Sequence, residues 1–230
     1  MKAFLENSVF WATILTLTTY MIGCAVKNKI NSPLAHPLLI SVILIIIFLL
    51  VFDIEYETYQ NEAKYISYFL TPATVCLAIP LYRQIELLKK HWKAVVAGIL
   101  SGVITSMASI LLMSILFGIT KQLYISLMSK SITTAIAIGI TEEYGGISTI
   151  TAAAICVTGV FGSISSSIVM KIFRIKNPIS VGLALGTSAH AMGTSKALEI
   201  GPVEGAMSGL SIALAGLMTV VLAPLFANLI

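Results

Sequence analysis

The sequence predicts an all-α, polytopic membrane protein with about seven to eight transmembrane segments. Composition is the first reason, because 57% of the 230 residues are hydrophobic and 10% are charged. Soluble domains are roughly 45 to 50% apolar and about 25% charged. The second reason is a series of apolar runs close to the roughly 17 to 25 residues that a bilayer requires. The third is that basic residues gather in short connectors, where they set orientation. The net charge of +4 therefore indicates no nucleic-acid partner.

Three apolar stretches open the chain. Residues 8–26 predict a transmembrane helix rather than a cleaved signal peptide, because only a weak basic lead-in precedes them. Residues 37–52, PLLISVILIIIFLLVF, are uniformly apolar and just long enough to cross. Residues 65–82 are apolar but contain Pro72 and Pro80, each of which removes a backbone donor and disfavours helix before it. We therefore expect the third stretch to be a broken span.

Two connectors of opposite charge flank this broken span. Residues 53–64, DIEYETYQNEAK, form an acidic cluster that must face water. Residues 83–93, RQIELLKKHWK, are basic and predict an amphipathic helix at the membrane interface. An apolar helix follows at 94–117, and small residues at every fourth position allow another backbone to approach it closely. These residues are Gly98, Gly102 and Ser106.

The second half of the chain has the same outline. Residues 146–170 predict an apolar helix, and KIFRIKN at 171–177 predicts a basic turn. Residues 178–197 form a second interrupted span, and 203–227 form a final helix that is again rich in small residues. The order of helix, broken helix and glycine-rich helix thus occurs twice, which predicts an internal duplication.

This duplication predicts one integral membrane domain over 1–230. Repeat 1 spans about 37–118, a linker with a re-entrant segment spans about 119–145, and repeat 2 spans about 146–230. Basic loops prefer the cytoplasm, so the linker must begin and end on the outer side. The two repeats then have inverted topology, with seven crossings. If residues 123–141 cross the membrane completely, the number of crossings is eight.

Residues 186–197, GTSAHAMGTSKA, place polar groups inside an apolar span. In hydrocarbon, such backbone persists only where protein buries it or where it lines a wet cavity. One interpretation is structural: glycines allow close helix crossing, threonines bond to the carbonyl four residues back, and the histidine is a core residue. The other is a binding site, which we favour for the group as a whole because ionisable residues at membrane depth are usually functional. Its members are Gly186, Thr187, His190, Gly193 and Thr194.

A site of this kind suits a small carboxylate. Broken helices direct half-helix N-termini into the membrane, where free N–H groups favour an anion. Hydroxyls of Thr133, Thr134, Thr187 and Thr194 would contact a neighbouring keto or hydroxyl oxygen, as in a small 2-oxo or 2-hydroxy acid. His190 is a proton-coupling candidate because imidazole exchanges a proton near neutral pH. Glu142 is a second candidate, although EEYGG is also typical of a solvated turn.

No enzyme, metal site or cofactor is expected. Ser188 and Ser195 lie near His190, but no carboxylate occupies a recognisable position to orient the imidazole, so we assign no catalytic residue. The three histidines and three cysteines are scattered without the spacing of metal ligands or of a disulfide framework.

Three stretches resemble signature segments of the LrgB/CidB family, whose plastid relative is the glycolate/glycerate translocator. They are TPATVCLAIPLYRQIELLKKHW, SKSITTAIA followed by EEYGGI, and GLALGTSAHAMGTSKALEIGPVEGAMSGL. The resemblance extends from about Pro37 to the C-terminus. It implies a cell-membrane (cytoplasmic membrane) protein with a small LrgA/CidA-like partner. We also expect a homo-oligomer, because the glycine-rich helices can pack between two copies as well as within one.

The resemblance adds three substrate-binding candidates. The family's PAT and PLYRQ motifs fall on residues 72–74 and 80–84, and its KS.TT motif falls on Lys130, Ser131, Thr133 and Thr134. From these segments we take Thr74, Arg83 and Ser131 as the additional candidates. Ala135 departs from the family pattern, which commonly has proline there, so a helix break at that position is less secure.

Two functions are attached to the family. One is transport of small monocarboxylates such as pyruvate, glycolate or glycerate, and the other is holin/antiholin-like modulation of murein hydrolase export and autolysis. A pore needs only a set of apolar or amphipathic helices, whereas a carrier needs a polar site at mid-depth. Because the sequence contains such a site, it favours a carrier, with proton coupling as an option.

Overall fold

The structure, a computed structural model, describes residues 10–30, 37–69, 72, 76, 78–83 and 85–230. These residues form helices and connecting turns, with no β-strand among them, so the all-α class is confirmed. The chain divides into two compact units, Met1–Cys76 and Leu77–Ile230, and each is described by itself.

Three helices of the first unit are described, α2 (Trp11–Lys29), α3 (Pro37–Val51) and α4 (Tyr56–Ser67). Helix α2 packs against both of the others. A buried hydrogen bond of 2.9 Å joins the hydroxyls of Thr19 and Ser41 between α2 and α3. The acidic connector forms α4 and is fastened to α2 by a hydrogen bond of 2.7 Å between Thr16 Oγ1 and Tyr59 Oη.

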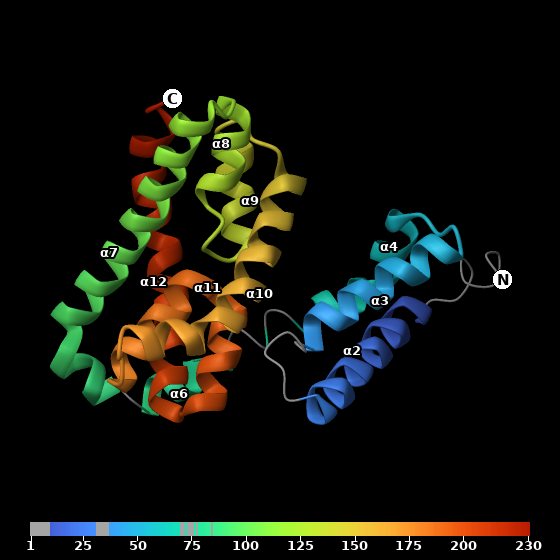
Figure 1. Cartoon of the computed structure of the whole chain (residues 1–230), viewed down its shortest axis with the longest axis horizontal. Coiled ribbons are helices and arrows are strands. Elements are labelled where there is room, and N and C mark those ends of the chain that lie inside the picture. The colour runs from blue at the N-terminus through green and yellow to red at the C-terminus, as the bar shows by residue number, and fades with distance from the viewer. Residues whose placement is uncertain (1–9, 31–36, 70–71, 73–75, 77, 84) are drawn as a thin grey trace. The chain divides into compact units, whose positions relative to one another are not determined.

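The second unit contains seven described helices, which Figure 1 shows as a bundle. They are α6 (Ala78–Arg83), α7 (Ile85–Phe117), α8 (Lys121–Met128), α9 (Thr134–Glu143), α10 (Ser148–Ile172), α11 (Pro178–Ile200) and α12 (Pro202–Ala227). Helix α7 is continuous, so most of the basic connector continues into the following helix instead of forming a separate interfacial one.

Three described helices are long and apolar enough to cross a membrane, namely Lys89–Phe117, Ser148–Ile172 and Pro202–Ala227. Helix α3 is also apolar but shorter. These helices support a multi-pass membrane protein. The further crossings and the inverted repeats stay predictions, and part of the broken span at 65–82 lies outside the described residues.

Helices α8 and α9 form a hairpin of two short helices. They have 8 and 10 residues, or roughly 12 and 15 Å at 1.5 Å per residue, whereas a hydrocarbon core is about 30 Å thick. Thr151 of α10 connects the end of α9 to α8. Its Oγ1 lies 2.8 Å from Thr141 Oγ1 of α9 and donates a hydrogen bond of 2.9 Å to the Ser126 carbonyl of α8. Residues 129–133, the tip loop, therefore lie at the turn of this hairpin.

Helix α11 is a second hairpin, because its backbone leaves the helical conformation at His190, with φ 41° and ψ −129°. A Cβ added to Gly193 would collide with the carbonyl of Leu185. These residues are eight apart, and a continuous helix would separate them by about 12 Å. The halves 178–189 and 191–200 therefore fold back on each other. The interruption predicted within 178–197 is confirmed, and its turn lies at His190.

Small residues hold this hairpin against its neighbours. Gly182 and Gly186 contact the backbone of α12 at Glu204 and Ser208. Gly102 of α7 faces the Thr187 methyl, and an added Cβ would lie 2.6 Å from it. This close approach of backbones is the role of small residues in membrane helices, and it agrees with the packing predicted for 94–117.

We predict that Gly186→Ala destabilises the protein by roughly 1 to 3 kcal/mol, because the new methyl overpacks a rigid backbone contact. Gly139→Ala is the matched control, since nothing lies within 4 Å of its added Cβ. Alanine favours helix over glycine by up to about 1 kcal/mol, so the control should be neutral or more stable. Thermal unfolding in detergent measures both variants. Equal melting temperatures for the two would contradict the packing described here.

Candidate functional site

A groove of about 1010 Å³ lies between α7, α10 and α11 and reaches the tip loop. Its volume is at the upper end of small-molecule sites, which span roughly 300 to 1,000 Å³. The wall residues on α7 run from His91 to Ser109, those on α10 from Val157 to Met170, and those on α11 from Ile179 to Ser188. All of these residues belong to the second unit.

Hydroxyl groups line the groove on all three helices. On α7, three of them recur at every fourth position, which places these three on one face of the helix. The set is Ser101, Thr105, Ser106 and Ser109 on α7, Thr158, Ser165 and Ser166 on α10, and Ser180, Thr187 and Ser188 on α11. Several donate to a carbonyl of their own helix, as Ser188 does to Ala184 at 2.6 Å. Their oxygens remain able to accept from water or a ligand.

Lys130 is the only Lys, Arg, Asp or Glu among the described residues that line the groove. It lies in the tip loop, between the end of α8 and the start of α9. Our sequence interpretation did not include Lys130 among the site residues, although the KS.TT motif of the family falls on it. The available signal was a single cation between Ser129 and Ser131, the only charged residue in 122–141.

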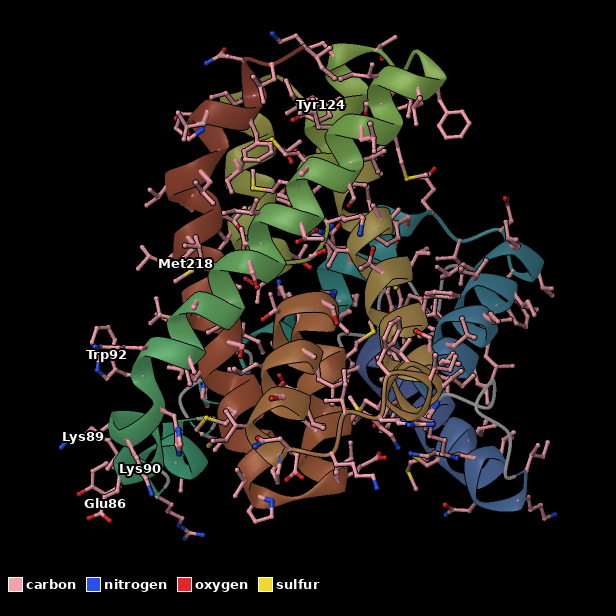
Figure 2. The ribbon with its side chains drawn as sticks, turned by 60° about the vertical axis from the view of Figure 1, so that its left-hand side comes forward. Glu86, Lys89, Lys90, Trp92, Tyr124 and Met218 are labelled. Carbon is pink, nitrogen blue, oxygen red and sulfur yellow. The ribbon has the colours of Figure 1, made fainter. Side chains whose placement is uncertain are left out.

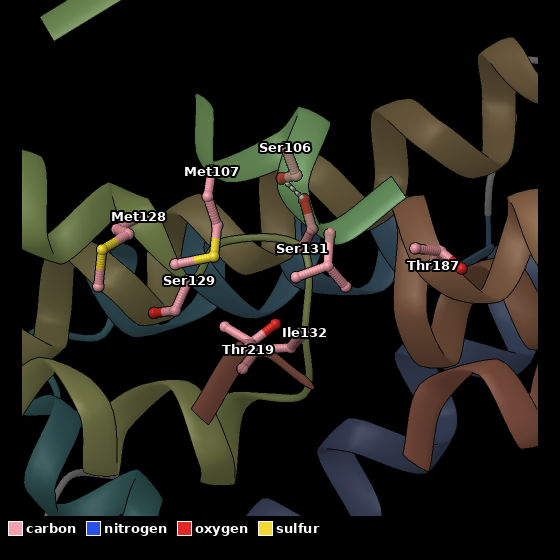
Figure 3. Close-up of a pocket in the computed structure, with 9 residues that line it drawn as sticks. Ser106, Met107, Met128, Ser129, Ser131, Ile132, Thr187 and Thr219 are labelled. Atoms are coloured by element: carbon pink, nitrogen blue, oxygen red, sulfur yellow. Dashed lines mark hydrogen bonds between the residues drawn. The ribbon is translucent and has the colours of Figure 1, made fainter. Parts of the chain in front are cut away.

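A second, much smaller cavity lies beside the tip loop, and its volume of about 10 Å³ is that of a single water. Figure 3 shows Ser106, Ser131 and Thr187 among its lining residues. The hydroxyls of Ser106 and Ser131 are 2.8 Å apart, and their hydrogen bond fastens the tip loop to α7. Val103 also lines this cavity, 14 residues from either end of Lys89–Phe117. The tip loop therefore lies near the middle of that span.

The turn of the α11 hairpin lies near the tip loop, because Thr187, three residues before His190, lines the same small cavity as Ser131. His190 is 4% exposed, and its Nε2 donates to the carbonyl of Ile155 at 3.0 Å. Its ring also lies against Gly159 of α10. The imidazole therefore connects the turn to α10, and His190 is not among the described residues that line either cavity.

Two helix N-termini lie at these turns. Helix α9 begins at Thr134, with no side-chain hydrogen bond from its N-cap residue Thr133. The returning half of α11 begins directly after His190. The first amide groups of a helix have no partner within it and carry partial positive charge. This arrangement is the one expected for half-helices that meet inside a membrane.

Within the GTSAHAMGTSKA motif, one predicted residue faces the cavities and three have packing roles. Thr187 lines both cavities, and its hydroxyl donates to Leu183 at 2.7 Å. Thr194 is buried and bonds to the Ser208 hydroxyl at 2.7 Å. Gly186 contacts α12, and Gly193 lies between the two halves of the hairpin. Within one motif, Thr187 thus lines the cavities, whereas Gly186, Gly193 and Thr194 make packing contacts.

The remaining predicted residues are dispersed. Ser131 lines both cavities, but Thr133 and Thr134 are not among the described lining residues. Glu142 is exposed near the far end of α9 and accepts a hydrogen bond of 3.1 Å from Ser148. Arg83 is exposed at the end of α6 and lines neither cavity. The prediction for Thr74 lies outside the described residues.

The groove extends from the tip loop toward the start of α7. His91 and Asn177 line its far end. In Figure 2, Lys89, Lys90 and Trp92 lie at this end of the bundle, and Tyr124 lies at the opposite end. Tyr124 is fully buried, and its hydroxyl donates to Phe226 at 3.0 Å. The groove lining thus reaches the end of the unit that carries Lys89 and Lys90, whereas Tyr124 is buried at the other end.

Comparison with protein families matches residues 16–229 to the model of the LrgB-like family. Antiholin-like protein LrgB of Bacillus mycoides (strain KBAB4), of Bacillus cereus (strain B4264) and of Bacillus anthracis (strain CDC 684 / NRRL 3495) is in each case 37% identical to this chain over 218 residues. The match covers 94% of this chain and 95% of each relative. No solved structure matches the chain. The resemblance inferred from the three motifs is confirmed.

We predict that His190→Ala unfolds more readily than His190→Gly. Both variants lose the hydrogen bond to Ile155, but only glycine adopts a φ of 41° without strain. The difference should be about 1 kcal/mol or more and should appear in thermal unfolding of the purified variants. If the alanine variant is the more stable of the two, α11 continues as a helix through His190, and the hairpin described for α11 is wrong.

Proposed function

The chain belongs to the LrgB-like family, and from that premise we propose that it is a secondary carrier of small monocarboxylates of the pyruvate, glycolate or glycerate class in the cell membrane. One observation carries the proposal. A hydroxyl-lined groove ends near the middle of a long apolar helix, beside a single lysine and near two helix N-termini, and no carboxylate is among its described lining residues.

The physical argument concerns the water that a carboxylate loses when it leaves solution. Desolvating a charge is costly unless donors replace its hydration. Hydroxyls, amide groups at helix N-termini and an ammonium group supply such donors. A 2-oxo or 2-hydroxy oxygen beside the carboxylate would be met by the hydroxyls of the groove. The donor set therefore fits a small organic monoanion better than an apolar ligand or a cation.

The open and closed ends of the second unit support alternating access. The groove lining reaches His91, close to Lys89 and Lys90 at the start of α7, and basic segments lie on the cytoplasmic side. The opposite end is packed around the buried Tyr124. The structure therefore corresponds, in this proposal, to a state open toward the cytoplasm. Transport requires a second state in which the hairpins separate on the outer side.

The proposal also covers proton coupling, protein partners and the inverted repeats. His190 is the preferred proton-coupling group, because it lies at the turn of the α11 hairpin, and Glu142 is the more distant candidate. An LrgA/CidA-like small membrane protein and a second copy of this chain are the proposed partners. Inverted repeats would provide the two related states that a carrier needs.

An alternative is a holin/antiholin-like modulator of murein hydrolase export and autolysis. The names of the curated relatives, Antiholin-like protein LrgB, favour it. A carrier is preferred because a pore has no need of a groove that ends at mid-span beside a lysine. Modulation of autolysis would then follow from metabolite flux or from assembly with the partner.

Uptake into proteoliposomes separates the two functions. We expect saturable uptake of labelled pyruvate, glycolate or glycerate by the purified protein, alone or together with the LrgA-like partner, and we expect inhibition by unlabelled substrate. Passage of ions and dyes regardless of their size, in the absence of saturation, would favour the pore.

We predict that Thr187→Val raises the KM of this uptake by roughly three- to tenfold. The substitution keeps the shape packed against Gly102 but removes a hydroxyl worth about 0.5 to 1.5 kcal/mol in a hydrogen bond. Ser195→Ala is the control, because Ser195 is exposed in the same motif and lines neither cavity. An unchanged KM for Thr187→Val would show that the Thr187 hydroxyl does not contact the substrate.

A further inference from the structure

We propose that Lys130 is the anion-binding residue of the groove and that its single charge makes the site selective for monoanions over dianions. This inference rests on the proposed carrier function and assigns the group within the same site that recognises the carboxylate. The ligand is a small organic acid with one negative charge at neutral pH.

The first argument is the position of Lys130. Its backbone N–H donates to Leu127 at 3.1 Å, in the turn that ends α8. The next residue, Ser131, bonds to Ser106 of α7 at 2.8 Å. The backbone on both sides of the lysine is thus fixed, while its half-buried side chain lines the groove. A cation is thereby held at a defined depth, near the middle of the longest span.

The second argument is the charge balance. Among the described residues, Lys130 has no carboxylate within ion-pair distance, and no Asp or Glu lines the groove. His190, on the α11 hairpin, offers no compensation, because an imidazole carries no negative charge. Ionisable groups at membrane depth are expensive and usually pair with a counter-charge. The missing counter-charge is the one that an anionic ligand brings.

The third argument concerns selectivity. An ammonium group is a compact point charge with three donors, so one lysine neutralises one carboxylate. A second carboxylate on the same ligand would lie in a groove whose other described lining residues carry no Lys or Arg. That unpaired charge would have to be desolvated without compensation. Dicarboxylates are thus rejected by the absence of a second cation.

Cysteine substitution followed by chemical modification tests the charge directly. The three native cysteines, Cys24, Cys76 and Cys156, are first replaced by serine, and Lys130→Cys is introduced into that background. We expect the KM for labelled pyruvate uptake to rise about ten- to a hundredfold, since a hydrogen bond to a charged group is lost. Aminoethyl methanethiosulfonate, which restores an ammonium group, should recover much of the uptake. Sulfonatoethyl and methyl methanethiosulfonate should not.

Lys121→Cys is the matched control, because Lys121 is an exposed lysine of the same hairpin that does not line the groove. Its uptake should be unchanged before and after each reagent. Unlabelled lactate should compete with pyruvate in the parent protein, whereas succinate should not.

The outcomes distinguish a failure of the Lys130 proposal from a failure of the proposed carrier function. If the cysteine-free parent transports pyruvate and Lys130→Cys keeps its KM within twofold, the lysine proposal is overturned and the carrier stands. Equal rescue by all three reagents, or competition by succinate as strong as that by lactate, also overturns it. If the parent shows no saturable uptake of pyruvate, glycolate or glycerate, the proposed function itself fails. Thermal unfolding of Lys130→Cys verifies that lost uptake does not reflect misfolding.

Discussion

The structure depends on one constraint, the need of every backbone polar group at membrane depth to find a partner. An unpaired amide in hydrocarbon costs several kcal/mol, so irregular backbone persists only inside protein or beside water. The tip loop and the turn at His190 are two such places within one unit. Both are surrounded by long helices, and the groove brings a polar surface to the tip loop. The candidate site therefore lies where the fold tolerates broken helices.

Close packing satisfies this constraint. Glycines on α7 and α11 let backbones approach until a methyl group would collide, as at Gly102 and Gly186. Hydroxyls then fasten the turns, between Ser106 and Ser131 and between Thr194 and Ser208. The same types of residue serve packing and polarity, which is why a motif rich in Gly, Thr and Ser is ambiguous when it is read alone.

A consequence is that the most conspicuous residue of the motif is not the one that faces the groove. His190 bonds to α10 and stabilises the turn, whereas the cation in the groove comes from Lys130, on the α8–α9 hairpin. Under the proposed carrier function, the group that holds the hairpin is distinct from the group that would meet the ligand. Movement of the hairpin would then change access to the ligand without disrupting the proposed site.

The sequence by itself determined the all-α class, the three long apolar helices, the interruption within α11 and the family, because hydropathy, helix-breaking residues and motifs are local properties of the chain. Only the tertiary structure decided which polar groups share a cavity. Thr187 and Ser131 meet at the same small cavity, whereas Arg83 and Glu142 lie elsewhere. The position of Lys130 depends on how two distant hairpins pack against α7, and no local pattern encodes that contact. Side-chain direction at a turn is set by the residues packed against that turn. The sequence therefore identified the segments that form the candidate site, but not which of their residues face the cavity.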